Sequence, residues 1–207
     1  MTNNMQSTNQ KSRIVTEIRE IGGGFIDPER VIADWDIKKG DKIADLGCGG
    51  GYFTIPIAQL IGDEGKMFAA DVMEGPIESV KSRAYLAKLT NVMVIRVNLE
   101  KKNSISRWIG NGGCDKVLLA SVLYTTDKKR AIIIEAKRIL KKGGSLIVVE
   151  WKKNAKSPRG SLGHFGPPGK NRIGEEELKN TIKKEGFKFV KGFESGSFHY
   201  GLIFSKQ

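Results

Sequence analysis

The stretch Lys42-Ile-Ala-Asp-Leu-Gly-Cys-Gly-Gly-Gly-Tyr-Phe53 decides the fold of this chain. Its apolar residues Ile43, Ala44 and Leu46 predict a short buried strand. Four glycines follow within five positions, and a glycine turn lets the backbone approach a ligand because no Cβ stands in the way. Residues 53–60 have the apolar spacing of a helix. The unit predicted is strand, glycine loop and helix, whose N–H groups can hold a nucleotide.

The spacing of the glycines distinguishes between kinds of nucleotide. A dinucleotide fingerprint requires Gly-x-Gly-x-x-Gly, and its third glycine would fall where this chain has Tyr52. The chain instead has Gly-x-Gly-x-Gly, with Asp45 two residues before the first glycine. This argues against a nicotinamide-dependent oxidoreductase. A glycine-rich turn in an unrelated α/β protein is the remaining alternative.

The pattern resembles the first motif of class I S-adenosylmethionine (SAM) dependent methyltransferases, Asp/Glu-x-Gly-x-Gly-x-Gly. Asp45, Gly47, Gly49 and Gly51 match it, and Cys48 lies inside the loop. The resemblance covers about residues 25–205 and is closest to the ubiquinone/menaquinone-biosynthesis-like (type 11) branch. It implies SAM as the cofactor of a methyl transfer. Because that branch methylates carbon, oxygen, nitrogen or arsenic, the resemblance selects no acceptor.

Residues 67–71 predict a second buried strand, and it ends in an acid. Asp71 comes 20 residues after Gly51, where a carboxylate accepts hydrogen bonds from ribose hydroxyls in nucleotide-binding sheets. The resemblance implies the same role. Val72 and Met73 would then flank the adenine ring, although Met73 is equally consistent with a core residue.

The third and fourth predicted strands, residues 91–97 and 114–120, add further cofactor candidates. Asn98 and Leu99 follow the third strand, and relatives often have an Asp at the position of Asn98 to accept from the adenine amino group; the Asn carbonyl can do the same. Ser121 follows the fourth strand, over the cofactor. Residues 120–124 lack the Asn/Asp-Pro-Pro-Tyr/Phe of enzymes that methylate amide or exocyclic amino nitrogens, which argues against those chemistries.

The rest of the chain continues the alternation of helices and strands. Asp27 and Asp127 are expected to cap helices, Pro28 to occupy a first helical position, and Gly143-Gly144 to end a helix. The other elements expected are helices at 14–21, 76–89 and 175–185 and strands at 145–150, 187–193 and 200–205. The pattern predicts an α/β Rossmann-like fold, with a seven-stranded mostly parallel sheet, helices on both faces and an antiparallel last strand pair. The candidate cofactor residues all fall at the carboxyl edge of that sheet, where such folds bind ligands.

Length and composition suit one folded domain. Of 207 residues, 39% are hydrophobic and 28% charged. We expect a disordered tail at 1–12 and a single domain at 13–207. Without a long apolar run or a signal-peptide pattern, we expect a cytoplasmic protein with no membrane span. Cys48 and Cys114 have no partners at metal-ligand spacing, so no metal and no disulfide are expected.

The net charge is +12, and residues 152–172 contribute +6 without a single acid. This basic loop suggests an acidic partner such as RNA. A lysine-rich solvated surface is the simpler interpretation.

Candidates for contact with the methyl acceptor are Tyr124, His164, His199 and Tyr200. His164 lies in the basic loop and could act as a base near neutral pH, or be a loop residue bonded to backbone. His199 and Tyr200 are interpreted as structural residues at the start of the last strand. Ile26, with Phe25, is a candidate to close over the cofactor, or simply to pack against its own helix.

Three hypotheses follow from the sequence. The first is a SAM-dependent methyltransferase with a small-molecule acceptor. The second is the same enzyme acting on RNA or protein through the basic loop. The third is a non-catalytic SAM-binding scaffold. The sequence sets neither the oligomeric state nor the general base.

Overall fold

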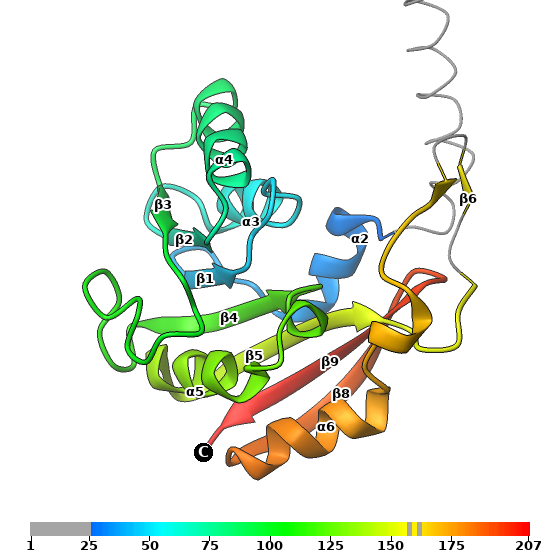
Figure 1. The fold of residues 1–207 in the computed structure, drawn as a ribbon. Helices are drawn as coiled ribbons and strands as arrows, with labels where there is room; N and C mark the ends of the chain where they lie inside the picture. The colour runs from blue at the N-terminus through cyan, green and yellow to red at the C-terminus, as the bar shows by residue number, and fades with distance from the viewer. Residues whose placement is uncertain (1–25, 157–158, 161–162) are drawn as a thin grey trace, which may run out of the picture.

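The computed structural model describes residues 26–156, 159–160 and 163–207, and one mixed sheet dominates it (Figure 1). The strand order is β3-β2-β1-β4-β5-β9-β8. The strands are β1 (Lys42–Leu46), β2 (Lys66–Asp71), β3 (Val92–Arg96), β4 (Cys114–Ala120), β5 (Leu140–Trp151), β8 (Phe187–Ser195) and β9 (His199–Lys206). Strands β1 to β5 pair in parallel, whereas β9 is antiparallel to both neighbours. The predicted Rossmann-like sheet is confirmed, including its antiparallel last pair.

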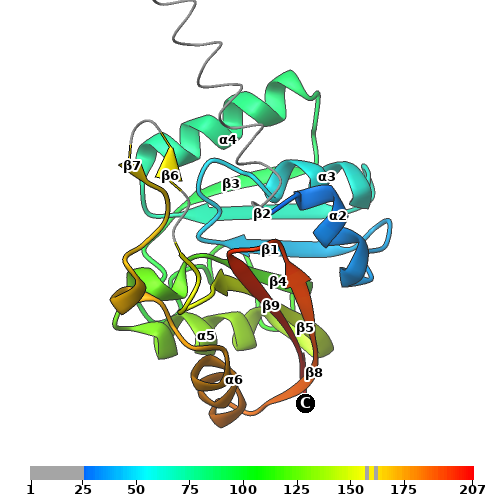
Figure 2. The ribbon, with the colours of Figure 1, turned by 90° about the vertical axis from the view of Figure 1, so that its right-hand side faces the viewer.

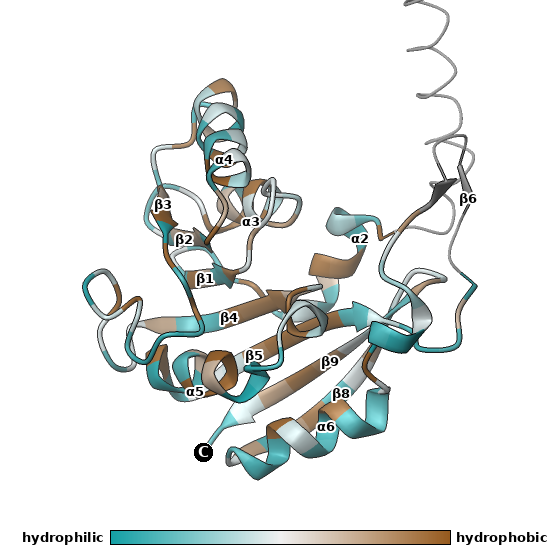
Figure 3. Cartoon of the chain, in the orientation of Figure 1, coloured by the Kyte–Doolittle hydropathy of each residue, from teal (hydrophilic) through white to brown (hydrophobic). Residues whose placement is uncertain are grey.

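Helices cover both faces of the sheet (Figure 2). The helices α2 (Pro28–Ile32), α3 (Thr54–Ile61) and α4 (Glu74–Leu86), with the 3-10 turn η1 (Ala33–Trp35), lie on one face; α5 (Lys129–Ile139) and α6 (Glu175–Lys184) lie on the other. The strand residues alternate between the two cores. Ile43 of β1 packs with α3, and its neighbour Ala44 packs on the α5 side. This alternation is what the period of two in a strand produces. Figure 3 shows the apolar strands between helices with hydrophilic outer surfaces.

The remaining elements are short and lie beyond the carboxyl ends of β4 and β5. They are the 3-10 turns η2 (Leu123–Thr125) and η3 (Gly169–Asn171) and the two-stranded ribbon β6 (Arg159–Gly160) and β7 (Gly163–His164). The tail at 1–12, the helix expected at 14–21 and Phe25 lie outside the described residues. In the described part of the chain, no helix has the length and apolar character needed to cross a membrane.

One predicted helix cap is confirmed and another is wrong. The Asp27 carboxylate accepts hydrogen bonds from the Glu29 and Arg30 amides, with Pro28 at the first helical position. Helix α5, by contrast, has Lys128 at its N-cap and no side-chain cap. The hydroxyl of Thr126 accepts from the Lys128 amide at 2.9 Å, so Thr126 rather than Asp127 shapes the entry to α5.

The prediction that Gly143-Gly144 ends a helix is also wrong. Helix α5 stops at Ile139, because Leu140 is extended, fully buried and already paired with Cys114 in the sheet. The register then shifts, and Gly143 takes a φ of +74° in the bulge. A Cβ at Gly144 would lie 2.8 Å from the carbonyl oxygen of Asp115. The two glycines therefore allow the β-bulge near the start of β5.

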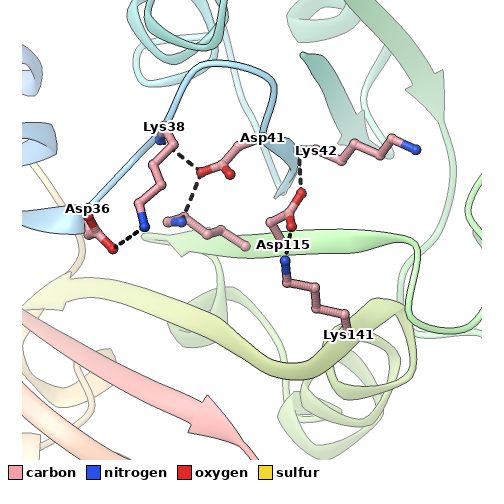
Figure 4. A network of polar contacts seen from close by, with 7 residues as sticks. Asp36, Lys38, Asp41, Lys42, Asp115 and Lys141 are labelled. Atoms are coloured by element: carbon pink, nitrogen blue, oxygen red, sulfur yellow. Dashed lines mark hydrogen bonds and ion pairs between the residues drawn. The ribbon is translucent and has the colours of Figure 1, made fainter. Parts of the chain in front are cut away.

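A polar network ties together the amino ends of β1, β4 and β5 (Figure 4). The Lys116 ammonium pairs with Asp41 at 2.9 Å, and both side chains are nearly buried. The Asp115 carboxylate accepts from the Lys42 amide at 2.7 Å and pairs with Lys141. These bonds connect the strands at the amino edge of the sheet. The glycine loop lies at the opposite, carboxyl edge, which is the edge available for a ligand site.

Candidate functional site

The glycine loop leaves β1 in a fixed path against β2. The amides of Gly47 and Cys48 donate to the carbonyl of Ala70, at 2.7 and 3.1 Å. Gly47 has a φ of +82°, and a Cβ there would overlap the side chain of Val122 at 2.5 Å. Gly49 has a φ of +51°, but no atom of the described residues lies within 4 Å of a Cβ built on it. One glycine is thus required by packing, while the other leaves its backbone open to a ligand.

The carboxylate of Asp71 orders this loop from the end of β2. One oxygen accepts from the Gly49 amide at 3.0 Å, and the other accepts from the Met73 amide at 2.9 Å. Each oxygen keeps further acceptor capacity for a ligand hydroxyl. Val72 and Met73 are 55% and 62% exposed, so the chain presents apolar side chains beside this carboxylate.

A second acid, Asp45, lies beneath the loop at the end of β1. It is 2% exposed and accepts a hydrogen bond from the Thr54 hydroxyl at 2.7 Å. Burial raises the pKa of Asp45 to about 7, the charge of Asp71 adds to the rise, and the bond from Thr54 opposes it. Asp45 therefore titrates near neutral pH inside the site.

A cavity of about 350 Å³ opens above these groups, at the carboxyl edge of the sheet. This size suits a small-molecule ligand. Five of the residues selected from the sequence line it: Asp45, Gly47, Cys48, Gly49 and Ser121. Ile26, the candidate to close over the cofactor, and His199 also line it. The structure adds Gly50, Tyr52, Phe53, Ala120 and Trp151 to the lining. The Tyr52 hydroxyl donates to the carbonyl of Ile26, which ties the start of α2 to the loop.

The other sequence candidates for the cofactor are not among the residues that line this cavity. The Gly51 amide donates to the Cys48 carbonyl at 3.0 Å, within the loop. The side-chain oxygen of Asn98 accepts from the Glu100 amide at 2.9 Å, and Leu99 is buried in the core on the α5 side. Among the described residues, no cluster of His, Cys, Asp or Glu is placed to hold a metal ion, and the two thiols are free.

Ser121 has unusual backbone geometry where β4 ends. It has a φ of +53°, although it is not glycine, and its amide donates to the Val149 carbonyl at 2.8 Å. Non-glycine residues rarely adopt this region, and they do so chiefly where the surroundings fix them, often at functional sites.

Trp151 and His199 form the wall of the cavity on the β5–β9 side. Sequence analysis did not select Trp151, and it interpreted His199, one of its acceptor candidates, as a structural residue. The two residues are register partners, and their ring centroids lie 4.0 Å apart. Burial lowers the pKa of His199 to about 4, and the charges of Arg172 and Lys152 lower it further. Its Nδ1 is sealed from solvent and has no hydrogen-bond partner among the described residues. Only the antiparallel register, which sequence patterns do not give, places this pair at the cavity.

The other three candidates for acceptor contact are dispersed. Tyr124, in η2, lines a separate polar cavity. Tyr200 is 5% exposed and its hydroxyl donates to the Ile173 carbonyl at 3.1 Å; burial raises its pKa, with a further rise from Glu150. The backbone of His164 pairs with Arg159 in the β6–β7 ribbon, and the His164 side chain lies outside the described part of the structure.

The sheet order, the open glycine loop and the acid at the end of β2 define a nucleotide-binding α/β protein of the Rossmann-like class. Residues 37–190 match the model of the family described as "methyltransferase domain", and the chain belongs to that family. The resemblance to class I methyltransferases noted from the first motif is thereby confirmed at the level of the family.

Individual proteins show how far the similarity extends. The "ubiquinone/menaquinone biosynthesis C-methyltransferase UbiE" of Pasteurella multocida is 28% identical over 130 residues, 62% of this chain and 47% of the relative. The chain thus spans about half the length of such curated relatives.

Solved structures share the fold at lower identity. A SAM-dependent methyltransferase from Aquifex aeolicus superposes with a TM-score of 0.76 at 23% identity, over 87% of this chain and 89% of that one. The cyclase SpnF gives 0.68 at 17% identity, over 86% and 79%. Because one of these neighbours is titled a cyclase, the fold by itself does not establish methyl transfer.

Proposed function

We propose that the chain binds SAM in the glycine-loop cavity and transfers its methyl group to a small-molecule acceptor. The observation that carries this proposal is the open face of Gly49, whose amide is held by the Asp71 carboxylate at the mouth of a ligand-sized cavity. A backbone that can be approached without a Cβ, beside an acid with spare acceptor capacity, fits the ribose end of a nucleoside.

The other residues at this edge fit the remaining parts of the cofactor. Val72 and Met73 offer exposed apolar surface for a flat base, and Asn98 and Leu99 follow the neighbouring strand β3. Asp45 and Ser121 line the cavity beneath the loop, where they would meet the polar amino-acid end. Bound SAM supplies an activated methyl group on a sulfonium. What the chain contributes is alignment of the acceptor with that methyl and exclusion of water.

The wall formed by Trp151 and His199 belongs to the acceptor side in this proposal. Both side chains come from the half of the sheet that does not carry the glycine loop, and both line the same cavity. His199 is kept neutral by burial and by two neighbouring cations, so it can exchange a hydrogen bond with an acceptor but binds a proton poorly. This favours an acceptor that needs no strong base from the protein.

The basic loop gives less support to RNA as the acceptor than its sequence suggested. Arg172 is 3% exposed, and its guanidinium donates inward to the carbonyls of Pro167, Lys152 and Ala155. The cations of residues 152–172 are therefore not all directed outward, and at least one holds the loop together. A scaffold without transfer activity stays an alternative, since it would share the same cavity.

Calorimetric titration with S-adenosylhomocysteine, with NADH as control, tests the cofactor. We expect binding of the former only, because the loop lacks the third fingerprint glycine and has Tyr52 there. Binding of NADH alone would overturn the proposal. If S-adenosylhomocysteine binds, the next experiment offers the protein SAM with a labelled methyl group and a panel of small metabolites, with RNA in parallel. Transfer of the label distinguishes an enzyme from a scaffold.

A further inference from the structure

A second cavity, of about 420 Å³, lies at the same carboxyl edge of the sheet, between the segment after β4 and the segment after β5. It shares no lining residue with the glycine-loop cavity. Three lysines reach it from three different places: Lys129 at the start of α5, Lys153 after β5 and Lys170 in η3. Lysines brought together from separate segments create a positive field within a concave surface.

Several hydrogen-bond donors in this lining have no partner in the described part of the chain. The ammonium groups of Lys153 and Lys170, the side-chain amide of Asn171 and the hydroxyl of Tyr124 all belong to this group. Two carboxylates, Asp127 and Glu177, also line the cavity, yet neither forms an ion pair with these lysines. Lys153 and Lys170 thus retain their donor capacity, which charge-assisted bonds to an anion would use, whereas the Lys129 ammonium already donates to the Thr126 carbonyl at 2.6 Å.

The position of the cavity links it to the proposed transfer site. Arg172 lines the polar cavity, and its guanidinium carbon lies 5.3 Å from the ring centroid of Trp151, which lines the glycine-loop cavity. Tyr124 follows Ser121 by three residues, and these two residues line one cavity each. The two cavities therefore adjoin on either side of the Trp151–Arg172 contact.

We propose that the polar cavity binds the anionic group, a phosphate or carboxylate, of a small methyl acceptor whose reacting atom enters the neighbouring glycine-loop cavity. The anion site stands on its own geometry, whereas its role for an acceptor rests on the proposed function. Lys153, Lys170 and Asn171 are exposed, and Lys129 is half-buried. Donors that three segments bring to one concave site suit a single anionic group, whereas an extended nucleic-acid backbone would use lysines spread along a surface.

Titration of the full chain with inorganic phosphate and, separately, with acetate at constant ionic strength tests the site. We expect saturable binding of at least one anion, and a loss of roughly tenfold in affinity when Lys153→Gln and Lys170→Gln are combined. The matched control combines Lys188→Gln and Lys191→Gln, two exposed lysines of β8 that lie outside the cavity. This control removes the same charge, and its affinity should stay within about twofold of the parent.

Titration of each variant with S-adenosylhomocysteine separates this proposal from the proposed function. Binding of the nucleoside without saturable binding of either anion would overturn the anion site and leave the proposed function standing. Binding of an anion without the nucleoside would keep the site and remove its role in methyl transfer. An equal loss of anion affinity in the two double variants would show surface electrostatics only and overturn the proposal. Binding of a short oligoribonucleotide would do the same if its affinity fell steeply with salt and weakened equally in both variants.

Discussion

Trp151 and His199 face each other across β5 and β9 with their ring centroids 4.0 Å apart, and both line the glycine-loop cavity. This contact holds an imidazole in a buried place beside Arg172 and Lys152. Protonating His199 would bury a further positive charge there. The pair is therefore stable with a neutral imidazole and is weakened by acid.

Acidification should destabilise the protein through His199. Its folded pKa of about 4 lies below the ordinary value of 6.5, so its stabilising effect is complete above about pH 6.5 and is lost as the pH falls toward 4. Between about pH 7.5 and 5 the loss should reach about 2 kcal/mol of unfolding free energy. Chemical unfolding of the parent and of His199→Gln at both pH values measures it.

The sequence has two histidines, which makes the control simple. The His164→Gln variant should keep the parent's pH dependence, because it retains His199. The prediction would be contradicted if His199→Gln lost as much stability on acidification as the parent does.

Much of the fold was predictable because its signals are local. The short apolar runs of β1, β2 and β4 and the cap at Asp27 each depend on a few neighbouring positions, and these elements lie within a few residues of the expected ones. The misplaced helix end at Gly143-Gly144 has a different cause. There the pairing of Leu140 with Cys114, a contact distant in sequence, prevailed over the local glycine signal.

The candidate site divides in the same way. Gly49 and Asp71 were selected from spacing along one strand, loop and helix unit, and the structure joins them by a hydrogen bond. Trp151 and His199 come from strands whose antiparallel register no local pattern fixes. The polar cavity could not be predicted either, because the inward hydrogen bonds of Arg172 arrange the loop around it. The sequence of this loop shows only that it is basic.

Replacement of Gly49 by Ala should abolish nucleoside binding at a modest cost in stability. In the part of the chain that the structure describes, nothing lies within 4 Å of the added Cβ, so the methyl group would occupy the space proposed for the ligand. The positive φ should cost about 1 kcal/mol or slightly more. Calorimetry with S-adenosylhomocysteine and a thermal unfolding curve measure the two effects.

Gly40 provides a matched control for Gly49. It also has a positive φ and open space around a built Cβ, but it precedes β1 and lies away from the cavity. Gly40→Ala should show a similar cost in stability with unchanged binding. Equal binding by the two variants would show that the loop is not the nucleoside cradle.

Removal of the Asp71 carboxylate should weaken binding of S-adenosylhomocysteine. Asp71→Ala deletes an acceptor for ribose hydroxyls and frees the Gly49 amide, which we expect to cost about 1 to 3 kcal/mol of binding free energy. Asp63→Ala makes the same charge change at an exposed position after α3. If calorimetry gave both variants the same affinity, the ribose would not lie at Asp71.

Ionisation of Glu150 should destabilise the protein as the pH rises. Glu150 is fully buried, and one of its oxygens accepts from the amides of Leu123 and Tyr124, while the other has no partner in the described parts of the chain. Burial raises its pKa to about 7 from 4.5, so the folded state binds the proton more tightly than the unfolded state does. Stability is therefore lost between about pH 4.5 and 7.

The Glu150→Gln variant stays neutral and keeps a carbonyl oxygen for the two amides, so it should escape this loss. Its unfolding free energy relative to the parent should improve by about 2 kcal/mol between about pH 5 and 8. The comparison at each pH cancels the titration of Asp45, which the two proteins share. If the difference in unfolding free energy between variant and parent did not change with pH, Glu150 would stay ionised in the folded protein, stabilised by Lys129 and the two amides. Burial would then cost the ionised carboxylate less free energy than its surroundings suggest.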